Sequence, residues 1–333
     1  MPAPGPRNLI TDVAGLEVGH ATDEAVRTGV TVLVCPGGWT AAMDLRGGGP
    51  ATRETDALAL ENLVGQAHAI CLSGGSVFGL AAADGVTAAL SAKDQGLRLS
   101  PVTPAIPIVP AASLHDLANG GDKAWGLEPP YRRLGLAAVE AASADFALGA
   151  VGAGRGAMAG TRPGGIGSAS FDLGEGLIIG ALAAVNPVGS VYAEDGASFL
   201  SAPYELNDEF GGRGLSAQPF DGAPIPPLTK LAPGLGVQPR TNTTLCVIAV
   251  SAELTRAECK RIAMMAQDGL ARAIRPAHTP FDGDIVFCVA KGAPLSTEGP
   301  RERSIAVIGS AAADTLARAI ARGVYAAEVN AAE

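Results

Sequence analysis

Aromatic side chains are scarce in this 333-residue chain, in which Phe, Trp and Tyr together make up only 4% of the sequence. Hydrophobic residues still account for 47%, and glycine occupies 44 positions. The core must therefore be built from Ala, Val, Leu and Ile, with close backbone contacts at glycine. This composition is typical of a tightly packed α/β enzyme. A chain of this length can form one large core or two closely packed halves.

Cysteine and histidine are too few and too scattered to predict a disulfide framework or a metal centre. The five cysteines are odd in number and lie mostly inside apolar runs, so we interpret them as small buried residues of a protein in a reducing compartment. The four histidines show neither an HExxH motif nor a paired ligand spacing. No metal site is predicted, and no cofactor is expected.

Positive charge is also in short supply. The 24 Lys and Arg residues are outnumbered by 33 Asp and Glu residues, which gives a net charge of −9. The cations are scattered along the chain, so no nucleic-acid partner is predicted. The N-terminus lacks a basic segment followed by an apolar one, and no uninterrupted apolar run approaches about 18 residues. We expect a soluble cytoplasmic protein without a membrane partner.

The order of the predicted elements indicates a layered α/β fold. Between residues 150 and 185 the pattern predicts consecutive strands without helices between them, which favours a layered fold over a doubly wound sheet. The segment Thr255-Arg-Ala-Glu258 matches a capping box and predicts the start of a helix that ends near Ile274. The predicted strands are 29–34, 68–72, 150–156, 166–173, 177–185, 244–251 and 284–290, and the other predicted helices are 77–92, 132–147 and 311–327.

The most informative feature that is present is the junction between Asn242 and Thr243. A segment rich in proline and glycine, residues 219–239, gives way at this threonine to a predicted buried strand. If the Asn242–Thr243 bond breaks, Thr243 becomes an N-terminus whose hydroxyl and α-amine lie on one residue. Such an amine, with a reference pKa of about 7.7–8.0, can act as the general base for its own hydroxyl. In isolation, the same residues are also typical of a polar turn.

Two carboxylates precede the next predicted strand, in Thr279-Pro-Phe-Asp282-Gly283-Asp284. One residue separates them, so a turn at Gly283 can direct both side chains the same way. An isolated motif of this kind is typical of a solvated turn. Together with Thr243, the pair can orient a nucleophile and stabilise an ammonium group beside it.

The motifs Asn242-Thr-Thr before an apolar strand and His278-Thr-Pro-Phe-Asp-Gly-Asp284 are two of several blocks that occur in a recognisable order. The chain resembles the N-terminal-nucleophile family of L-aminopeptidase D-amidase/esterases, which includes β-peptidyl aminopeptidases and the 6-aminohexanoate-oligomer (nylon-oligomer) hydrolase. The resemblance covers nearly the whole chain. Its other blocks are Ile10-Thr-Asp-Val13, Val18-Gly-His20, Arg46-Gly-Gly-Gly-Pro-Ala-Thr-Arg-Glu-Thr-Asp56, Leu72-Ser-Gly-Gly-Ser76, Gly79-Leu-Ala-Ala-Ala-Asp-Gly85 and Val185-Asn-Pro-Val-Gly189.

This resemblance implies an αββα layered sandwich of the N-terminal-nucleophile type, and an amide hydrolase that needs no cofactor. It implies a precursor cut into an α chain, 1–242, and a β chain, 243–333, which associate and form homo-oligomers, with a homotetramer of αβ units expected. Thr243 is then the nucleophile and base, and Asp282 and Asp284 are the supporting carboxylates. Asn186 matches an asparagine at the nucleophile or oxyanion site. The substrate class stays open among α-peptides, D-amino-acid amides, β-peptides and ω-amino-acid oligomers.

The chain departs from the family pattern at two places. His115 lies where the nylon-oligomer hydrolase has a tyrosine, and Pro163 occupies the lysine position of a Lys-Gly-Gly segment, with Arg162 beside it. A lysine there can polarise a carbonyl or hold a carboxylate pair, whereas proline offers no such group. We take His115 and Arg162 as candidate substrate-binding residues, and the missing lysine is expected to affect the rate of cleavage and the choice of substrate.

Two other interpretations are compatible with parts of the sequence. The segment Gly152-Ala-Gly154-Arg-Gly-Ala157 approximates a glycine fingerprint for dinucleotides, although Pro163 and further glycines interrupt the helix that should follow. Alternatively, the chain is a non-catalytic relative that binds a small molecule and kept the fold after losing the lysine. The joint presence of Asn242, Thr243, Asp282 and Asp284 favours the hydrolase over both.

Overall fold

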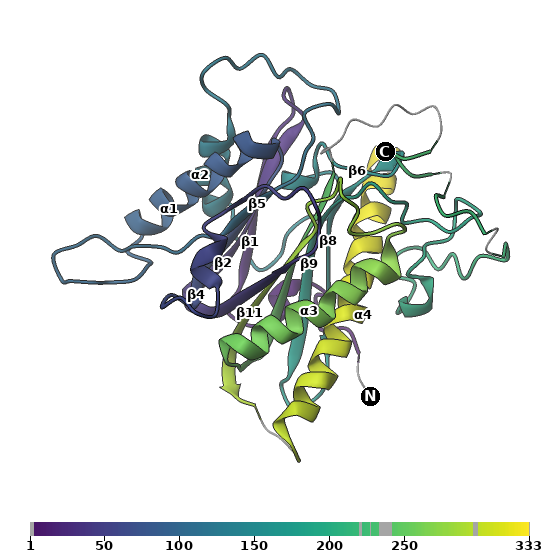
Figure 1. The fold of residues 1–333 in the computed structure, drawn as a ribbon. Helices are drawn as coiled ribbons and strands as arrows, with labels where there is room; N and C mark the ends of the chain where they lie inside the picture. The colour runs from purple at the N-terminus through teal and green to yellow at the C-terminus, as the bar shows by residue number, and fades with distance from the viewer. Residues whose placement is uncertain (1–2, 220–221, 227, 233–241, 296–298, 333) are drawn as a thin grey trace.

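The computed structural model describes residues 3–219, 222–226, 228–232, 242–295 and 299–332 (Figure 1). Its helices are α1 (Ala82–Ala92), α2 (Tyr131–Glu140), α3 (Arg256–Ala273) and α4 (Arg301–Ala332). Its strands are β1 (Glu17–Asp23), β2 (Thr28–Leu45), β3 (Thr52–Arg53), β4 (Gln66–Ser73), β5 (Ala111–Ser113), β6 (Met158–Ala159), β7 (Arg162–Pro163), β8 (Gly165–Asp172), β9 (Ile178–Asn186), β10 (Thr243–Glu253) and β11 (Ile285–Pro294).

The long strand β2 connects two halves of a mixed sheet. The strand order is β3-β5-β4-β2-β11-β10-β9-β8, with β1 also paired to β2. Residues 30–34 of β2 pair with β4 and with β1, whereas residues 40–45 pair with β11. Between these parts, Gly37 and Gly38 adopt φ values of 70° and 75°, which glycine tolerates without strain. One strand therefore contributes to both halves of the sheet.

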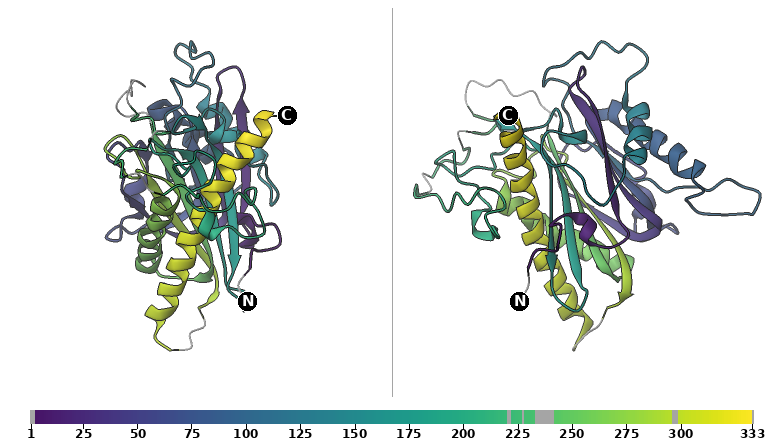
Figure 2. Two further views of the ribbon diagram at one scale, coloured as in Figure 1. Left: turned by 90° about the vertical axis from the view of Figure 1, so that its right-hand side faces the viewer. Right: turned by 180° about the vertical axis from the view of Figure 1, so that it is seen from behind.

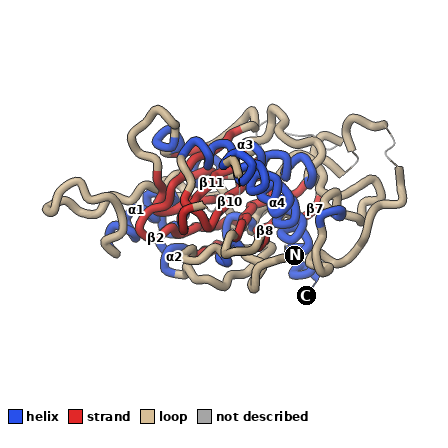
Figure 3. The backbone as a smooth tube through the Cα atoms, turned by 90° about the horizontal axis from the view of Figure 1, so that it is seen from below, coloured by secondary structure: helices blue, strands red, loops and turns tan. Residues whose placement is uncertain are grey.

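Alternating side chains of the strands fill three successive core layers. Val30 and Val32 of β2 pack outward against α1 and α2, while Leu33, the residue after Val32, points into the layer shared with β10 and β11. The opposite face of β10, including Ile248, packs against α3 and α4. Because successive side chains of a strand point to opposite faces, this distribution requires two sheet layers between two helix layers. The predicted αββα sandwich is confirmed, and Figure 3 shows the strands between α2 on one side and α3 and α4 on the other.

Two C-terminal helices cover the outer face of β8–β11. The capping box predicted at the start of α3 is present, because the Thr255 side chain accepts a hydrogen bond from the Glu258 N–H and Glu258 reaches back to the Thr255 N–H. Helix α4 runs along β8 and β9 (Figure 2). By length and composition α4 could cross a membrane, but 72% of its apolar window is buried inside the protein, as in the core helix of a globular fold.

The predicted helix 311–327 is part of the longer α4, Arg301–Ala332. Two other predicted elements differ from the structure because tertiary hydrogen bonds replace local ones. The predicted strand 150–156 is instead a short 3-10 turn at Gly152–Gly154, and the hydroxyls of Thr22 and Thr31 accept the N–H groups of residues 152 and 153. No helix begins there, so the dinucleotide interpretation is wrong. The helix predicted at 132–147 ends at residue 140, because the backbone of Ser143 forms two hydrogen bonds with Val18 of β1.

Candidate active site

Thr243 is the first residue of β10, one residue before the predicted start of this strand, and only 3% of it is exposed. Strand β10 lies between β9 and β11, and Thr243 is paired with Asn186, the last residue of β9. Apolar residues follow along the strand and fix β10 between the central core layer and the layer under α3 and α4. The threonine is therefore held at the end of a central strand, and its hydroxyl lies against the loop that enters β11.

The carbonyl oxygen of Asn242, which precedes Thr243, accepts hydrogen bonds from two donors. The Thr243 hydroxyl donates to the carbonyl oxygen of Asn242, and the N–H of Gly283 donates to the same oxygen at 3.1 Å. A Cβ atom on Gly283 would lie 2.7 Å from Thr243 Oγ1, so only glycine allows the loop to approach the hydroxyl this closely. Gly283 was not identified as a site residue from the sequence, where it was seen only as a turn between two aspartates.

Asp284 fixes the backbone at the start of β10. Its Oδ1 accepts the N–H of Thr244 at 2.8 Å, and its Oδ2 accepts the N–H of His278 at 3.0 Å and lies 3.0 Å from His278 Nδ1. The carboxylate is completely buried. It links the residue after the nucleophile to the loop that leads into β11.

Asp282 fixes the backbone that follows β9. Its Oδ1 accepts the N–H of Val188 at 3.0 Å, and its Oδ2 accepts the backbone N–H and the hydroxyl of Thr279 at 3.0 and 2.6 Å. Burial, followed by the nearby charge of Asp284, raises the pKa of Asp282 to about 6. The structure thus places Asp284 against the backbone of Thr244, next to the predicted nucleophile, and Asp282 against the backbone that follows β9.

The glycine-rich block after β2 is hydrogen-bonded to the loop that carries the two aspartates. The N–H of Gly47 donates to the carbonyl oxygen of Asp284, and the N–H of Gly48 donates to that of Thr279. A Cβ on Gly47 would lie 2.3 Å from the Asp284 nitrogen, and one on Gly48 would lie 2.8 Å from the Pro280 Cα. Side chains at either position would displace the loop that carries the aspartates.

Asn186 connects the site to three further segments. Its Oδ1 accepts the N–H of Met158 at 2.9 Å, and its Nδ2 donates to the carbonyl oxygen of His115 at 3.1 Å. The residue is fully buried. The structure therefore brings Asn186 to Thr243 by strand pairing, and it brings His115 beside Asn186 through the backbone of His115. Burial also lowers the pKa of the His115 imidazole.

A lysine does reach the site, from a position that the sequence did not suggest. Lys230 Nζ donates to the side-chain oxygen of Asn242 at 2.6 Å and to that of Asn186 at 3.4 Å. Burial lowers its pKa to about 7, and the charge of Asp282 opposes this shift. The chain contains only five lysines, so Lys230 was one of few residues that could replace the lysine missing at position 163. Its place in a proline-rich segment without a periodic pattern gave no indication of where it would lie.

The sequence matches the model of peptidase family S58 over residues 8–332. The chain belongs to peptidase family S58. It is 42% identical to an uncharacterized aminopeptidase of Mycobacterium tuberculosis (strain ATCC 25618 / H37Rv) over 96% of this chain and 94% of the relative. It is 29% identical to a 6-aminohexanoate-oligomer endohydrolase of Paenarthrobacter ureafaciens over 94% of this chain and 84% of that protein. The chain is thus an amide-bond hydrolase, as its resemblance implied.

Solved structures of low identity share the fold of this S58 peptidase. A Burkholderia sp. beta-aminopeptidase has a TM-score of 0.67 at 22% identity, with 97% of this chain and 88% of that one covered. The L-aminopeptidase D-Ala-esterase/amidase from Ochrobactrum anthropi, described as a variant of the Ntn hydrolase fold, has a TM-score of 0.67 at 19% identity, with 98% and 88% covered. The fold is therefore that of the Ntn hydrolases.

Two predicted positions of the S58 peptidase lie beside the site rather than in it. Pro163 pairs with Met158 in the β6–β7 ribbon, and Met158 is the residue whose N–H contacts Asn186. Arg162 is exposed, and its guanidinium lies 5.4 Å from the ring centre of Tyr192 and 3.9 Å from Glu328. Its described contacts are with the segment that follows β9 and with α4, and none of them is with Thr243.

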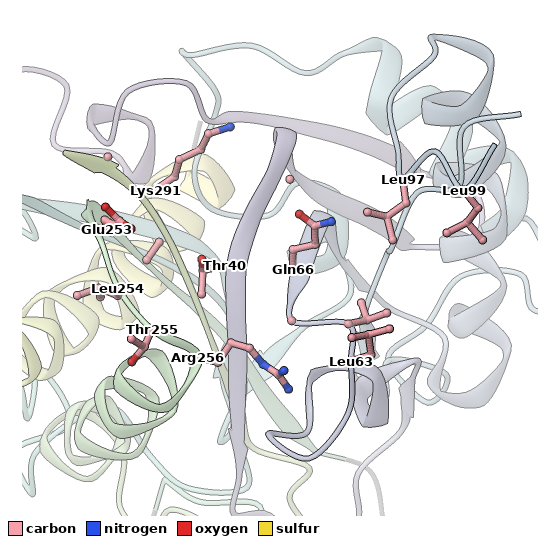
Figure 4. A pocket seen from close by; sticks show the side chains of 15 residues that line it. Thr40, Leu63, Gln66, Leu97, Leu99, Glu253, Leu254, Thr255, Arg256 and Lys291 are labelled. Atoms are coloured by element: carbon pink, nitrogen blue, oxygen red, sulfur yellow. The ribbon is translucent and has the colours of Figure 1, made fainter. Parts of the chain in front are cut away.

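One cavity of this S58 peptidase lies at the other end of β10. It has a volume of about 680 Å³, and Figure 4 shows side chains of β2, β4, β10 and β11 around it. Glu253 and Leu254 line it, whereas Thr243 begins the same strand. At about 3.3 Å per residue, the length of β10 places roughly 33 Å between this cavity and the predicted nucleophile. We therefore assign no part of the hydrolysis to this cavity.

Proposed function

We propose that this protein is a self-processing N-terminal-nucleophile amidase or aminopeptidase that uses Thr243 as its nucleophile. One observation carries the proposal. The Thr243 hydroxyl is hydrogen-bonded to the carbonyl group of the preceding residue, and the Gly283 N–H is hydrogen-bonded to the same carbonyl oxygen. A nucleophile and a donor for the developing oxyanion thus meet at one peptide bond.

Processing in this proposal is an N-to-O acyl shift followed by hydrolysis. Thr243 Oγ1 attacks the carbonyl carbon of Asn242, and the negative charge that develops on the carbonyl oxygen is stabilised by the Gly283 N–H. The C–N bond then breaks, the hydroxyl proton passes to the departing nitrogen, and Asn242 is left as an ester on Thr243. Water cleaves the ester, which releases the Asn242 carboxylate and leaves Thr243 with a free hydroxyl and a free α-amine.

Turnover repeats this chemistry on an external amide. The new α-amine accepts the Thr243 hydroxyl proton while the oxygen attacks the substrate carbonyl, and the ammonium then protonates the leaving amine. The resulting acyl-enzyme is hydrolysed by water. Asp284 fixes Thr244 and Asp282 fixes Val188, so the carboxylates contribute by holding the backbone around the nucleophile and by balancing the ammonium charge.

The two chains are expected to remain together after the cut. Strand β10, which would belong to the β chain, is hydrogen-bonded on one side to β9 of the α chain and on the other side to β11. Helices α3 and α4 share a core with β8 and β9. Separation would expose this core to water, so the processed protein is expected to behave as one αβ unit. We also propose that these αβ units form homo-oligomers, as the family resemblance implies.

The substrates proposed are small peptides, amino-acid amides or ω-amino-acid oligomers. The support is the family membership together with relatives described as an aminopeptidase and as a 6-aminohexanoate-oligomer endohydrolase. The expected location is the cytoplasm, and no cofactor is needed for this chemistry.

A substrate panel with trapping of the intermediate tests this function. The processed protein is incubated with amino-acid p-nitroanilides, D-amino-acid amides, β-dipeptides and 6-aminohexanoate oligomers, and the β chain is examined for added mass. Hydrolysis of at least one class with an acyl adduct on Thr243 is expected. Clean processing without turnover and without any adduct would favour a binding protein over a hydrolase.

A further inference from the structure

In the uncut chain, Asn242 provides the acyl group that lies against the Thr243 hydroxyl. The hydroxyl already donates to the carbonyl oxygen of this residue. During turnover the same oxygen must approach a substrate carbonyl to about 3–3.5 Å. The acyl residue of a substrate therefore has to lie close to where Asn242 lies now, and the surroundings of the Asn242 side chain describe the acyl pocket.

The residue that faces this side chain is Lys230. Its ammonium donates to Asn242 Oδ1 at 2.6 Å, and Asn242 is only 1% exposed. A second, longer contact of 3.4 Å joins the ammonium to Asn186 Oδ1. The acyl pocket thus presents a cation to the end of a side chain that has the length of asparagine.

The backbone around Lys230 is fixed by contacts on both sides. Its own N–H donates to the carbonyl oxygen of Val188 at 3.0 Å, and the carbonyl oxygen of Leu228 accepts the N–H of Thr161 at 3.1 Å. Thr229 between them is fully buried. Val188 in turn donates to Asp282. These contacts do not involve Asn242, so they can hold the lysine in place when the acyl residue changes.

We propose that Lys230 selects the acyl side of the substrate, and that the preferred substrates are amides and peptides whose N-terminal residue carries a short side chain ending in an oxygen acceptor, namely aspartate or asparagine. This inference rests on the proposed function, since it names the substrate class of the same nucleophile. A hydrogen bond to a charged group is stronger than one between neutral groups, whereas an unpaired buried ammonium is unfavourable.

Two consequences follow for other acyl groups. An apolar side chain such as leucine leaves the ammonium with only its longer contact to Asn186 Oδ1. A lysine or arginine side chain places a second cation against it. We expect kcat/KM to fall in the order Asp, Asn, Leu, Lys. The values for Asp and Asn should exceed those for Leu and Lys by about tenfold to a hundredfold. Burial lowers the pKa of Lys230 to about 7, and an anionic acyl group would favour its charged form.

The first arm of the test measures turnover in trans. The processed parent is compared with Lys230→Met on the p-nitroanilides or amides of Asp, Asn, Leu and Lys. The variant is expected to lose about tenfold or more on Asp and Asn and to change little on Leu. Lys291→Met, which removes an exposed lysine at the far end of β11, serves as the matched control and is expected to keep the order of the parent.

The second arm uses self-cleavage of the full chain and does not depend on obtaining a processed Lys230→Met protein. Asn242→Asp is expected to keep rapid processing, whereas Asn242→Lys is expected to slow it by about tenfold or more. Combining Asn242→Lys with Lys230→Glu should restore much of that loss, because the opposite charges exchange places. Equal processing rates for all acyl residues, with no recovery in the double variant, would overturn the assignment of Lys230.

Failure of this inference is distinguishable from failure of the proposed function. If the parent hydrolyses amides through a Thr243 adduct but shows no preference among the four acyl groups, only the role of Lys230 is overturned. If no substrate yields turnover or an adduct, the proposed function itself is wrong.

Discussion

The N–H of Gly283 donates to the carbonyl oxygen of Asn242 at 3.1 Å, and a Cβ on Gly283 would lie only 2.7 Å from Thr243 Oγ1. One backbone group thus contacts the carbonyl to be attacked while leaving room for the hydroxyl that attacks it. This relationship couples the loop before β11 to the start of β10. It also explains why the two aspartates are separated by glycine rather than by a larger residue.

Gly283→Ala should therefore slow self-processing strongly. The added methyl group displaces either the Thr243 hydroxyl or the N–H that stabilises the oxyanion, and loss of one such donor typically costs about 10²–10³ in rate. Band ratios on a denaturing gel during a time course measure the effect. Gly49→Ala is the matched control, since its Cβ would meet nothing closer than 3.6 Å, and it should process within about twofold of the parent. Equal rates for both variants would contradict the role of Gly283.

Asp284→Asn should impair processing and turnover by more than about tenfold and should destabilise the protein by about 1–3 kcal/mol. An amide cannot accept the N–H groups of Thr244 and His278 at both of its ends, so one buried donor is left facing another. Chemical denaturation and a processing time course measure the two effects. The surface substitution Asp268→Asn on α3 should change neither the processing rate nor the stability. Processing of Asp284→Asn at the rate of the parent would show that this carboxylate has only a structural role in the turn.

Asn186→Ala is expected to lower kcat by about 10²–10³ and to change KM much less, if its amide helps to stabilise the oxyanion during acylation. The substitution also removes the bonds to Met158 and His115. Steady-state kinetics on the best substrate of the panel separates kcat from KM. Asn119→Ala, which loses the side-chain hydrogen bond to the Gly156 carbonyl oxygen, is the control. A rise in KM with unchanged kcat would show that Asn186 only binds substrate.

The buried amine of Lys230 predicts a particular pH dependence of stability. Its pKa is lowered to about 7 in the folded chain, whereas an unperturbed lysine has a pKa of about 10.4. Between about pH 7 and pH 10 the unfolded chain binds more protons at this residue, so the folded state gains stability as pH rises, by up to about 1.4 kcal/mol per pH unit.

This gain should disappear in Lys230→Met. Urea unfolding of both chains is compared at several pH values in a Thr243→Ala background, so that both remain uncut. The exposed Lys93→Met provides the control and should follow the parent. Parallel pH profiles for the parent and Lys230→Met chains would contradict a lowered pKa at residue 230.

The sequence predicted those features that depend on neighbouring residues. The strand that begins at Thr243 and the capping box at Thr255 follow from local apolar pattern and from side chains three residues apart. The strand pairing that joins Thr243 to Asn186 spans more than fifty residues, so local patterns could not predict it. Only the family resemblance predicted that Thr243, Asn186 and the aspartates lie close together.

Contacts between distant backbone segments could not be predicted in the same way. Lys230 reaches Asn242 because residues 228–230 are hydrogen-bonded to Thr161 and Val188, and no local pattern specifies those bonds. The oxyanion contact of Gly283 is made by a backbone N–H, which every residue other than proline possesses. Its importance becomes visible only when its partner, the Asn242 carbonyl, is located.

The most direct test of the central claim is the intact mass of the purified parent and of Thr243→Ala. The account predicts that the parent yields two chains, of residues 1–242 and 243–333, and that Thr243→Ala yields a single chain of 33.2 kDa. Thr243→Ser, which keeps a hydroxyl, should still be cut. A Thr243→Ala protein that is cut between residues 242 and 243, or a parent that stays a single chain after prolonged incubation, would contradict the assignment of Thr243 as the self-processing nucleophile.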